Sequence, residues 1–182
     1  MNNVLVAYFS RVGNNYVNGK IKYLKVGNTE IVAEMIQKLT NADIFKIETV
    51  QSYPEDYHEM TNLAKKELKN NIYPKIIKHS ENIKEYDVIF LGYPNWWGTM
   101  PMPVFTFLKE FSFKDKLIIP FCTHEGSGLG ESIKDIKKVC IGADIGKGLS
   151  LLGNRVNEKE TAERVKIWIQ GLKISNNESG GE

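Results

Sequence analysis

The feature that most restricts the fold is an apolar run at residues 88–92, V-I-F-L-G, which ends abruptly in a stiff aromatic loop. A continuous run of apolar or small residues is typical of a strand buried on both faces, as inside a parallel sheet. The loop at residues 93–103 contains two adjacent tryptophans, one glycine and three prolines, and a helix is expected to follow from residue 104. Because open α/β sheets receive planar ligands at the carboxyl ends of their strands, this aromatic loop predicts a ligand site.

Apolar runs and amphipathic segments alternate along the rest of the chain. The expected strands are 4–9, 43–49, 88–92, 117–122 and 148–152. The expected helices are 28–39, 57–70, 104–108, 133–139 and 161–172. The second strand alternates apolar and polar residues, which places it nearer the sheet edge. Strands that alternate with helices predict an α/β fold with three layers, built on a doubly wound sheet of five parallel strands.

One domain is expected over residues 1–174, because 182 residues with 42% hydrophobic content suffice for one buried core. The tripeptide Val-Gly-Asn occurs at residues 12–14 and again at 26–28, on either side of an Asn18-Gly19 turn signal. Residues 12–26 are therefore interpreted as an inserted hairpin or ordered loop between the first strand and its helix. The polar Gly/Ser-rich residues 175–182 are expected to form a disordered tail.

Composition excludes several classes of function. A net charge of +2 with evenly mixed Lys and Glu does not suggest a nucleic-acid partner. The two cysteines, Cys122 and Cys140, form neither a disulfide framework nor a metal-ligand pattern, which favours a reducing compartment. No apolar run approaches the length of a membrane span, and no signal sequence precedes the first strand. These observations predict a soluble, cytoplasmic protein without a metal site.

Three loops that follow strands carry the candidate chemistry, and in a parallel sheet they meet at one edge. In the first, Ser10, Arg11, Asn28 and Thr29 lie at the start of a helix, where backbone N–H groups and the dipole favour a phosphate. An ordinary helix cap made by Asn28 or Thr29 explains these residues equally well.

The second and third loops supply rings and open backbone. Trp96 and Trp97 are adjacent, and adjacent residues rarely face one core, so at least one ring is expected to be partly exposed toward a ligand. The third loop, residues 123–130, has three glycines whose amides can approach a ligand closely. His124 in this loop is interpreted as an ordinary loop histidine rather than a catalytic base, and His58 and His79 as surface residues.

Together these motifs resemble the flavodoxins, specifically flavodoxin-like proteins whose second flavin loop carries Trp-Trp-Gly. The resemblance rests on Y-F-S at 8–10, G-N-T at 27–29, G-Y-P-N-W-W-G at 92–98 and C-T-H-E-G-S-G-L-G at 122–130. It implies bound FMN at the switch point of a sheet with strand order 2-1-3-4-5. The resemblance assigns the phosphate to Ser10, Arg11, Asn28 and Thr29, and the isoalloxazine to two loops: Pro94, Asn95, Trp96, Trp97 and Gly98, and Thr123, Glu125, Gly126, Ser127 and Gly128.

The chain departs from that family in two ways. Residues 12–26 interrupt the phosphate loop, so either Gly13-Asn14 or Gly27-Asn28 could occupy its expected place; the helix that follows favours the second pair. Electron-shuttling flavodoxins are usually acidic, whereas this chain is slightly basic.

The resemblance implies an FMN electron-transfer protein that docks on a redox partner protein, with no catalytic side chain. The alternative is an NAD(P)H-dependent FMN reductase of quinones or other small molecules. A non-catalytic binding module of the same fold is a third, less favoured hypothesis, because a phosphorylatable acidic cluster at the strand ends is missing.

Overall fold

A computed structural model describes residues 3–77, 83–172 and 174. His79 and the expected tail at 175–182 lie outside these residues. The chain forms a parallel sheet whose strand order is β4-β1-β5-β6-β7, with β8 also pairing with β6. The strands are β1 Val4–Tyr8, β4 Asp43–Lys46, β5 Val88–Pro94, β6 Leu117–His124, β7 Asp144–Ile145 and β8 Leu149–Leu152. The predicted α/β class and the order 2-1-3-4-5 are confirmed, with the fifth position shared by β7 and β8.

The fifth position is divided because β6 is long and its two halves have different neighbours. Leu117 and Ile118 pair with β7, whereas residues 121–124 pair with β8. These two strands are joined by the segment Gly146-Lys147-Gly148. The Gly146 amide donates to the Ile118 carbonyl at 2.8 Å, so the start of this segment remains bonded to β6. The sequence did not predict β7, since two residues that include an aspartate give no apolar run.

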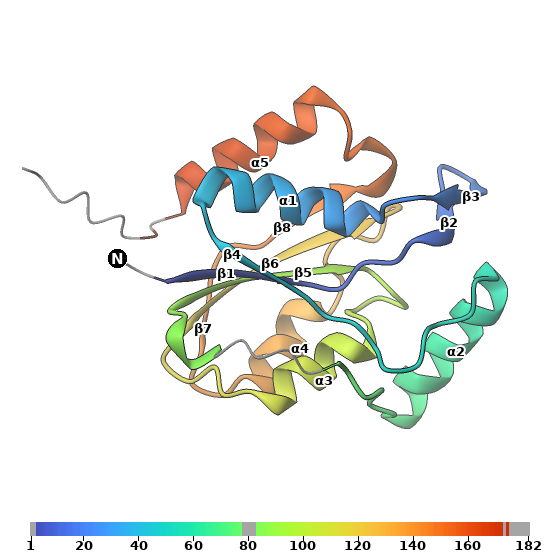
Figure 1. The fold of residues 1–182 in the computed structure, drawn as a ribbon, viewed down its shortest axis with the longest axis horizontal. Coiled ribbons are helices and arrows are strands. Elements are labelled where there is room, and N and C mark those ends of the chain that lie inside the picture. The colour runs from blue at the N-terminus through green and yellow to red at the C-terminus, as the bar shows by residue number, and fades with distance from the viewer. Residues whose placement is uncertain (1–2, 78–82, 173, 175–182) are drawn as a thin grey trace, which may run out of the picture.

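Helices cover both faces of the sheet (Figure 1). The helices are α1 Asn28–Thr40, α2 Tyr57–Asn70, α3 Met102–Glu110, α4 Ser132–Val139 and α5 Lys159–Gly171, with 3-10 turns Ile83–Glu85 and Gly153–Arg155. Helices α1 and α5 lie on one face and α3 and α4 on the other, while α2 stands beyond the sheet at its carboxyl end.

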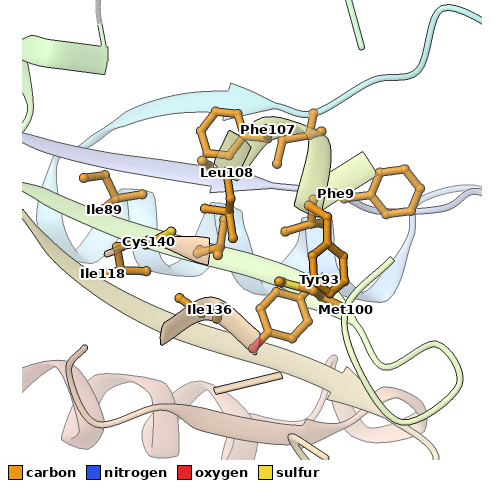
Figure 2. Packing of buried hydrophobic residues seen from close by; sticks show 14 of the residues in the cluster. Phe9, Ile89, Tyr93, Met100, Phe107, Leu108, Ile118, Ile136 and Cys140 are labelled. Carbon is orange, nitrogen blue, oxygen red and sulfur yellow. The ribbon is translucent and has the colours of Figure 1, made fainter. Parts of the chain in front are cut away.

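Successive side chains of a strand point to opposite faces of the sheet, so the strands contribute to two hydrophobic cores. In β1, Leu5 and Ala7 pack in the core under α3 and α4, whereas Val6 and Tyr8 pack against α1 and α5. Figure 2 shows the first core, where β5 and β6 contribute Ile89 and Ile118. Residues of β5 from Val88 to Tyr93 are all buried, as a central strand requires.

Two expectations for α1 were wrong in detail. Its N-cap is Gly27, which has no side chain, and neither Asn28 nor Thr29 caps the helix. The Ser10 hydroxyl, from the end of β1, instead accepts a hydrogen bond from the Glu30 amide at 3.1 Å. Leu39 is 47% exposed, whereas the buried face of α1 is formed by Thr29, Val32, Ala33 and Ile36.

Residues 12–26 contain an antiparallel hairpin of β2 Gly13–Val17 and β3 Lys20–Leu24. Asn18 and Gly19 form its turn with φ of 51° and 80°. Two consecutive positive φ angles define the turn type that joins twisted antiparallel strands most readily, and Asn-Gly favours it. The hairpin lies beside the carboxyl end of the sheet, at the same end of the molecule as α2 (Figure 1).

Candidate functional site

A cleft of about 480 Å³ opens at the carboxyl ends of β1, β5 and β6. Its walls come from the three loops expected from the sequence, together with the hairpin and α2. Of the predicted residues, those that line it are Ser10, Arg11, Asn28, Thr29, Pro94, Asn95, Trp96, Trp97, Thr123, Glu125 and Ser127. The volume falls within the range of about 300–1,000 Å³ that is usual for small-molecule and cofactor sites.

The first loop closes tightly around the start of α1. A Cβ atom on Gly27 would lie 2.2 Å from the Ser10 hydroxyl oxygen and 2.6 Å from the Arg11 carbonyl oxygen, so only glycine fits. Thr29 is buried, and its hydroxyl shares a 2.8 Å hydrogen bond with that of Thr123. This bond ties the first loop to the end of β6. Asn28 remains partly exposed at the helix N-terminus, where an anion is favoured.

Arg11 contributes a positive charge to the same end of the cleft. Its Nη2 donates to the carbonyl oxygens of Pro54 and Glu55 at 2.8 and 2.9 Å, and its Nη1 donates to that of Asn14. Burial lowers the pKa of the Arg11 guanidinium, although a guanidinium stays protonated near neutral pH. The charge is therefore held in place by backbone groups and can attract an anion through its field.

The two tryptophans of the second loop point in different directions. The Trp96 ring makes edge contacts at 5.3 Å between ring centroids with both Phe9 and Tyr53, and so joins the core. Trp97 is 49% exposed and has a positive φ of 55°, which turns its side chain outward. Its Nε1 donates to the Thr61 carbonyl of α2 at 2.9 Å. Both rings line the cleft.

The second and third loops are fastened to each other. Asn95 Nδ2 donates to the Gly128 carbonyl at 2.8 Å, while the Gly98 amide donates to Asn95 Oδ1 at 3.0 Å. A Cβ atom on Gly130 would lie 2.0 Å from the Gly98 carbonyl oxygen, and the Glu131 amide donates to that oxygen at 2.8 Å. Gly98 and Gly128 therefore shape the loops and are not part of the cleft lining.

His124 lines the cleft, although the sequence indicated only an ordinary loop histidine. Its Nδ1 accepts a hydrogen bond from the Gly126 amide at 2.9 Å, so the proton of the neutral ring is on Nε2. Burial lowers the pKa of His124 below its usual value, with a smaller lowering by Arg164 and an opposing effect of Glu125. The ring is therefore neutral near pH 7. Gly126, which bonds to this ring, is outside the cleft lining. His58 is exposed, as expected.

Two walls of the cleft were not predicted from the sequence. The hairpin contributes Asn15 and Tyr16, and α2 contributes Tyr57, Met60, Thr61 and Ala64; Gly153 completes the lining. The spacing of Tyr57, Met60 and Ala64 puts them on one helical face, so this stripe was the available signal. No comparable pattern in the hairpin indicates which of its faces meets the cleft.

Neither a membrane span nor a metal site is found among the described residues. None of the helices in this part of the chain is long and apolar enough to cross a membrane. Within residues 3–77, 83–172 and 174, no group of three or more His, Cys, Asp or Glu side chains could hold a metal ion.

The fold and the cleft define an α/β protein with a cleft at the switch point of its sheet. The family model for flavodoxin matches residues 3–172, so the chain belongs to the flavodoxin family. The resemblance to the flavodoxin family is confirmed. None of the curated proteins compared with the chain matches it.

Several solved structures are similar over nearly the whole chain. A provisionally assigned flavoprotein from Bacteroides eggerthii DSM 20697 is 28% identical, with a TM-score of 0.76, covering 96% of this chain and 100% of its own. Another from Bacteroides uniformis ATCC 8492 is 25% identical, with a TM-score of 0.72 and coverage of 93% and 98%. A flavoprotein from Lactobacillus acidophilus NCFM, solved in complex with FMN, is 18% identical, with a TM-score of 0.63 and coverage of 87% and 98%. At 18% identity, the likeness to the Lactobacillus acidophilus protein is one of fold.

Proposed function

We propose that this protein binds FMN in the cleft and transfers electrons through it. The observation that carries the proposal is the pairing, within one cleft, of the α1 N-terminus with the Trp96–Trp97 loop. One end suits a phosphate and the other suits a planar ring. The FMN complex of the Lactobacillus acidophilus relative supports the choice of ligand.

The residues at the phosphate end are suited to a dianion. The amides at the start of α1 supply hydrogen-bond donors, Asn28 supplies an amide side chain, and Arg11 supplies a fixed positive charge. Gly27 lets the backbone come close, because no Cβ stands in the way. We assign the phosphate to this end, with Ser10 ordering the helix start.

The residues at the other end are suited to isoalloxazine. Trp97 provides an exposed ring, and Trp96 provides one held rigidly by Phe9 and Tyr53. Thr123 and Ser127 place polar groups along another wall, where a ring edge can hydrogen-bond. When bound, FMN supplies the redox chemistry, and the protein supplies orientation and controls access.

We infer electron transfer to a redox partner protein as the leading activity, in line with the family. One observation favours an NAD(P)H-dependent reductase of quinones or similar small molecules. The hairpin and α2 add Tyr16, Tyr57 and Met60 to the walls, and these enclose the cleft with aromatic and apolar groups that suit small planar acceptors. Two buried free cysteines are compatible with a cytoplasmic location.

Spectroscopy tests the binding proposal directly. Purified protein, or apoprotein mixed with FMN, should show flavin absorbance and quenched flavin fluorescence, and mass spectrometry of released ligand should give FMN.

Asn28→Asp places a carboxylate at the helix start, which suits the apoprotein but repels a phosphate, so FMN affinity should fall more than about tenfold. A colourless protein that leaves added FMN fluorescent would contradict the proposal.

Steady-state kinetics separates the two activities. Rapid NAD(P)H oxidation with a quinone acceptor indicates the reductase. Photoreduction followed by electron delivery to an acceptor protein, without NAD(P)H turnover, indicates the electron-transfer protein.

A further inference from the structure

The hairpin β2–β3 leaves and rejoins the first loop at nearly the same point. The Gly27 backbone lies against Arg11, since a Cβ atom on Gly27 would be 2.6 Å from the Arg11 carbonyl oxygen. At its base, Asn15 Nδ2 donates to the carbonyl oxygens of Arg11 and Gly13 at 3.2 and 3.0 Å. The hairpin therefore begins and ends beside the start of α1, which is the proposed phosphate end of the cleft.

From this base the hairpin reaches two further walls of the cleft. The Tyr16 ring stacks on Tyr57, the first residue of α2, with 6.2 Å between ring centroids and 27° between ring planes. At the turn, the Asn18 amide donates to Glu125 Oε2 of the third loop at 2.8 Å. Tyr16 and Glu125 both line the cleft. The hairpin thus bridges the cleft from α1 to α2 and to the third loop.

Outside its base, the described contacts of the hairpin are those of Tyr16 and Asn18 and the burial of the Val17 side chain, which is 7% exposed. Residues 20–23 of β3 are all exposed, and Tyr23 is 62% exposed. A two-stranded hairpin is marginally stable alone in water, so its position depends on the base contacts, on the burial of Val17 and on the Tyr16 and Asn18 contacts. An element held over a cleft, beyond its base, by one ring contact, one hydrogen bond and one buried aliphatic side chain can open without unfolding the sheet.

We propose that the hairpin is a strap that retains FMN in the cleft, and that Glu125 is a positioning residue that latches the strap through the Asn18 amide. Tyr16 is the strap residue that faces the ligand. Oxygen Oε2 of Glu125 accepts the Asn18 bond, so the effect of Glu125 on the cofactor passes through the strap. This inference rests on the proposed FMN binding, which the experiments below test separately.

Flavin exchange kinetics tests the strap. Stopped-flow fluorescence should be followed on the whole protein, on Glu125→Ala and Tyr16→Ala, and on a variant lacking residues 13–26. That deletion joins Val12 to Gly27 and keeps one Val-Gly-Asn tripeptide. FMN dissociation should become about tenfold faster in each variant, which is the scale of one lost charge-assisted bond or ring contact. The association rate constant should also rise, because the cleft stands open.

Two matched controls accompany these variants. Tyr23→Ala removes an aromatic ring from the same hairpin but outside the cleft lining, and should leave both rate constants unchanged. Glu125→Gln keeps an oxygen that can accept the Asn18 bond and should lie between the wild-type protein and Glu125→Ala. Faster dissociation with an unchanged association rate would mean a simple contact and would overturn the strap.

Hydrogen exchange in the apoprotein tests the latch without any cofactor. The Asn18 amide should exchange slowly in the wild-type protein, faster in Glu125→Ala and at an intermediate rate in Glu125→Gln. Equal exchange in all three proteins would overturn the latch. Failure of the wild-type protein to bind FMN, in contrast, would contradict the proposed function and leave this exchange result to decide the latch. If the deletion variant does not fold, the two point variants still test the strap.

Discussion

The two adjacent tryptophans have different surroundings, and this difference can be measured. Trp96 contacts Phe9 and Tyr53, so Trp96→Ala should leave a cavity and lower the free energy of unfolding of the apoprotein by about 3 kcal/mol. Trp97 is half exposed, and Trp97→Ala should change apoprotein stability by less than about 1 kcal/mol while weakening FMN binding. Urea unfolding and FMN titration of both variants check this. Indistinguishable results would show that the two rings have the same role.

The buried carboxyl group of Glu67 predicts that the stability of the fold depends on pH. Glu67 of α2 is 6% exposed and accepts a 2.6 Å hydrogen bond from the Tyr53 hydroxyl. Burial raises the pKa of Glu67 above its ordinary value of 4.5, and the bond from Tyr53 lowers it by a smaller amount. The folded state therefore retains this proton to higher pH than the unfolded chain does. Its contribution to stability is full below pH 4.5 and is lost as the pH rises through the folded-state pKa.

Glu67→Gln should remove this loss. The amide oxygen can still accept the Tyr53 bond, but the side chain no longer ionises, so the free energy of unfolding should decline less between pH 4.5 and 7 than in the wild-type protein. Urea unfolding at several pH values is the measurement. Glu59→Gln, at an exposed position of the same helix, is the control. Parallel pH profiles for wild type and Glu67→Gln would contradict the assignment.

Among the elements, the second and third loops depend on one close approach. Gly130 has a φ of 55° and no room for a Cβ beside the Gly98 carbonyl oxygen. Gly130→Ala should push the loops apart, cost about 1–3 kcal/mol and weaken FMN binding, because both loops form walls of the cleft. Gly171→Ala, at a site with open space, is the control. Thermal unfolding and FMN titration check the result, and a Gly130→Ala protein with wild-type values for both would refute it.

At the scale of the whole molecule, ligand binding should stabilise the fold by mass action. FMN at a concentration one hundred times its dissociation constant should add about 2.7 kcal/mol. For a chain of this size that raises the melting temperature by about 5–10 °C. Riboflavin, which lacks the phosphate, should raise it much less at the same concentration, because the α1 N-terminus and Arg11 then have no anion to bind. Calorimetry of the apoprotein with each ligand measures the two shifts in melting temperature. Equal shifts would contradict the assignment of the phosphate to the α1 end of the cleft.

Much of this organisation is determined by the sequence alone. Continuous apolar runs such as residues 88–92 specify buried parallel strands, and the periodicity of residues 57–70 specifies α2, since burial follows the local side-chain period. Parallel strands bring the loops after them to one edge, so eleven predicted residues meet in one cleft without any knowledge of distances. Asn18-Gly19 likewise specifies its own turn, because the two residues favour positive φ.

Only the tertiary structure decided how separate segments meet. The pairing of Ser10 with the Glu30 amide, the outward turn of Trp97 and the place of His124 depend on contacts between residues far apart in the chain. The same holds for the hairpin, whose strands are local but whose position over the cleft is set by Tyr57 and Glu125. Local periodicity records which face of an element is buried, and it carries no information about which distant group lies opposite that face.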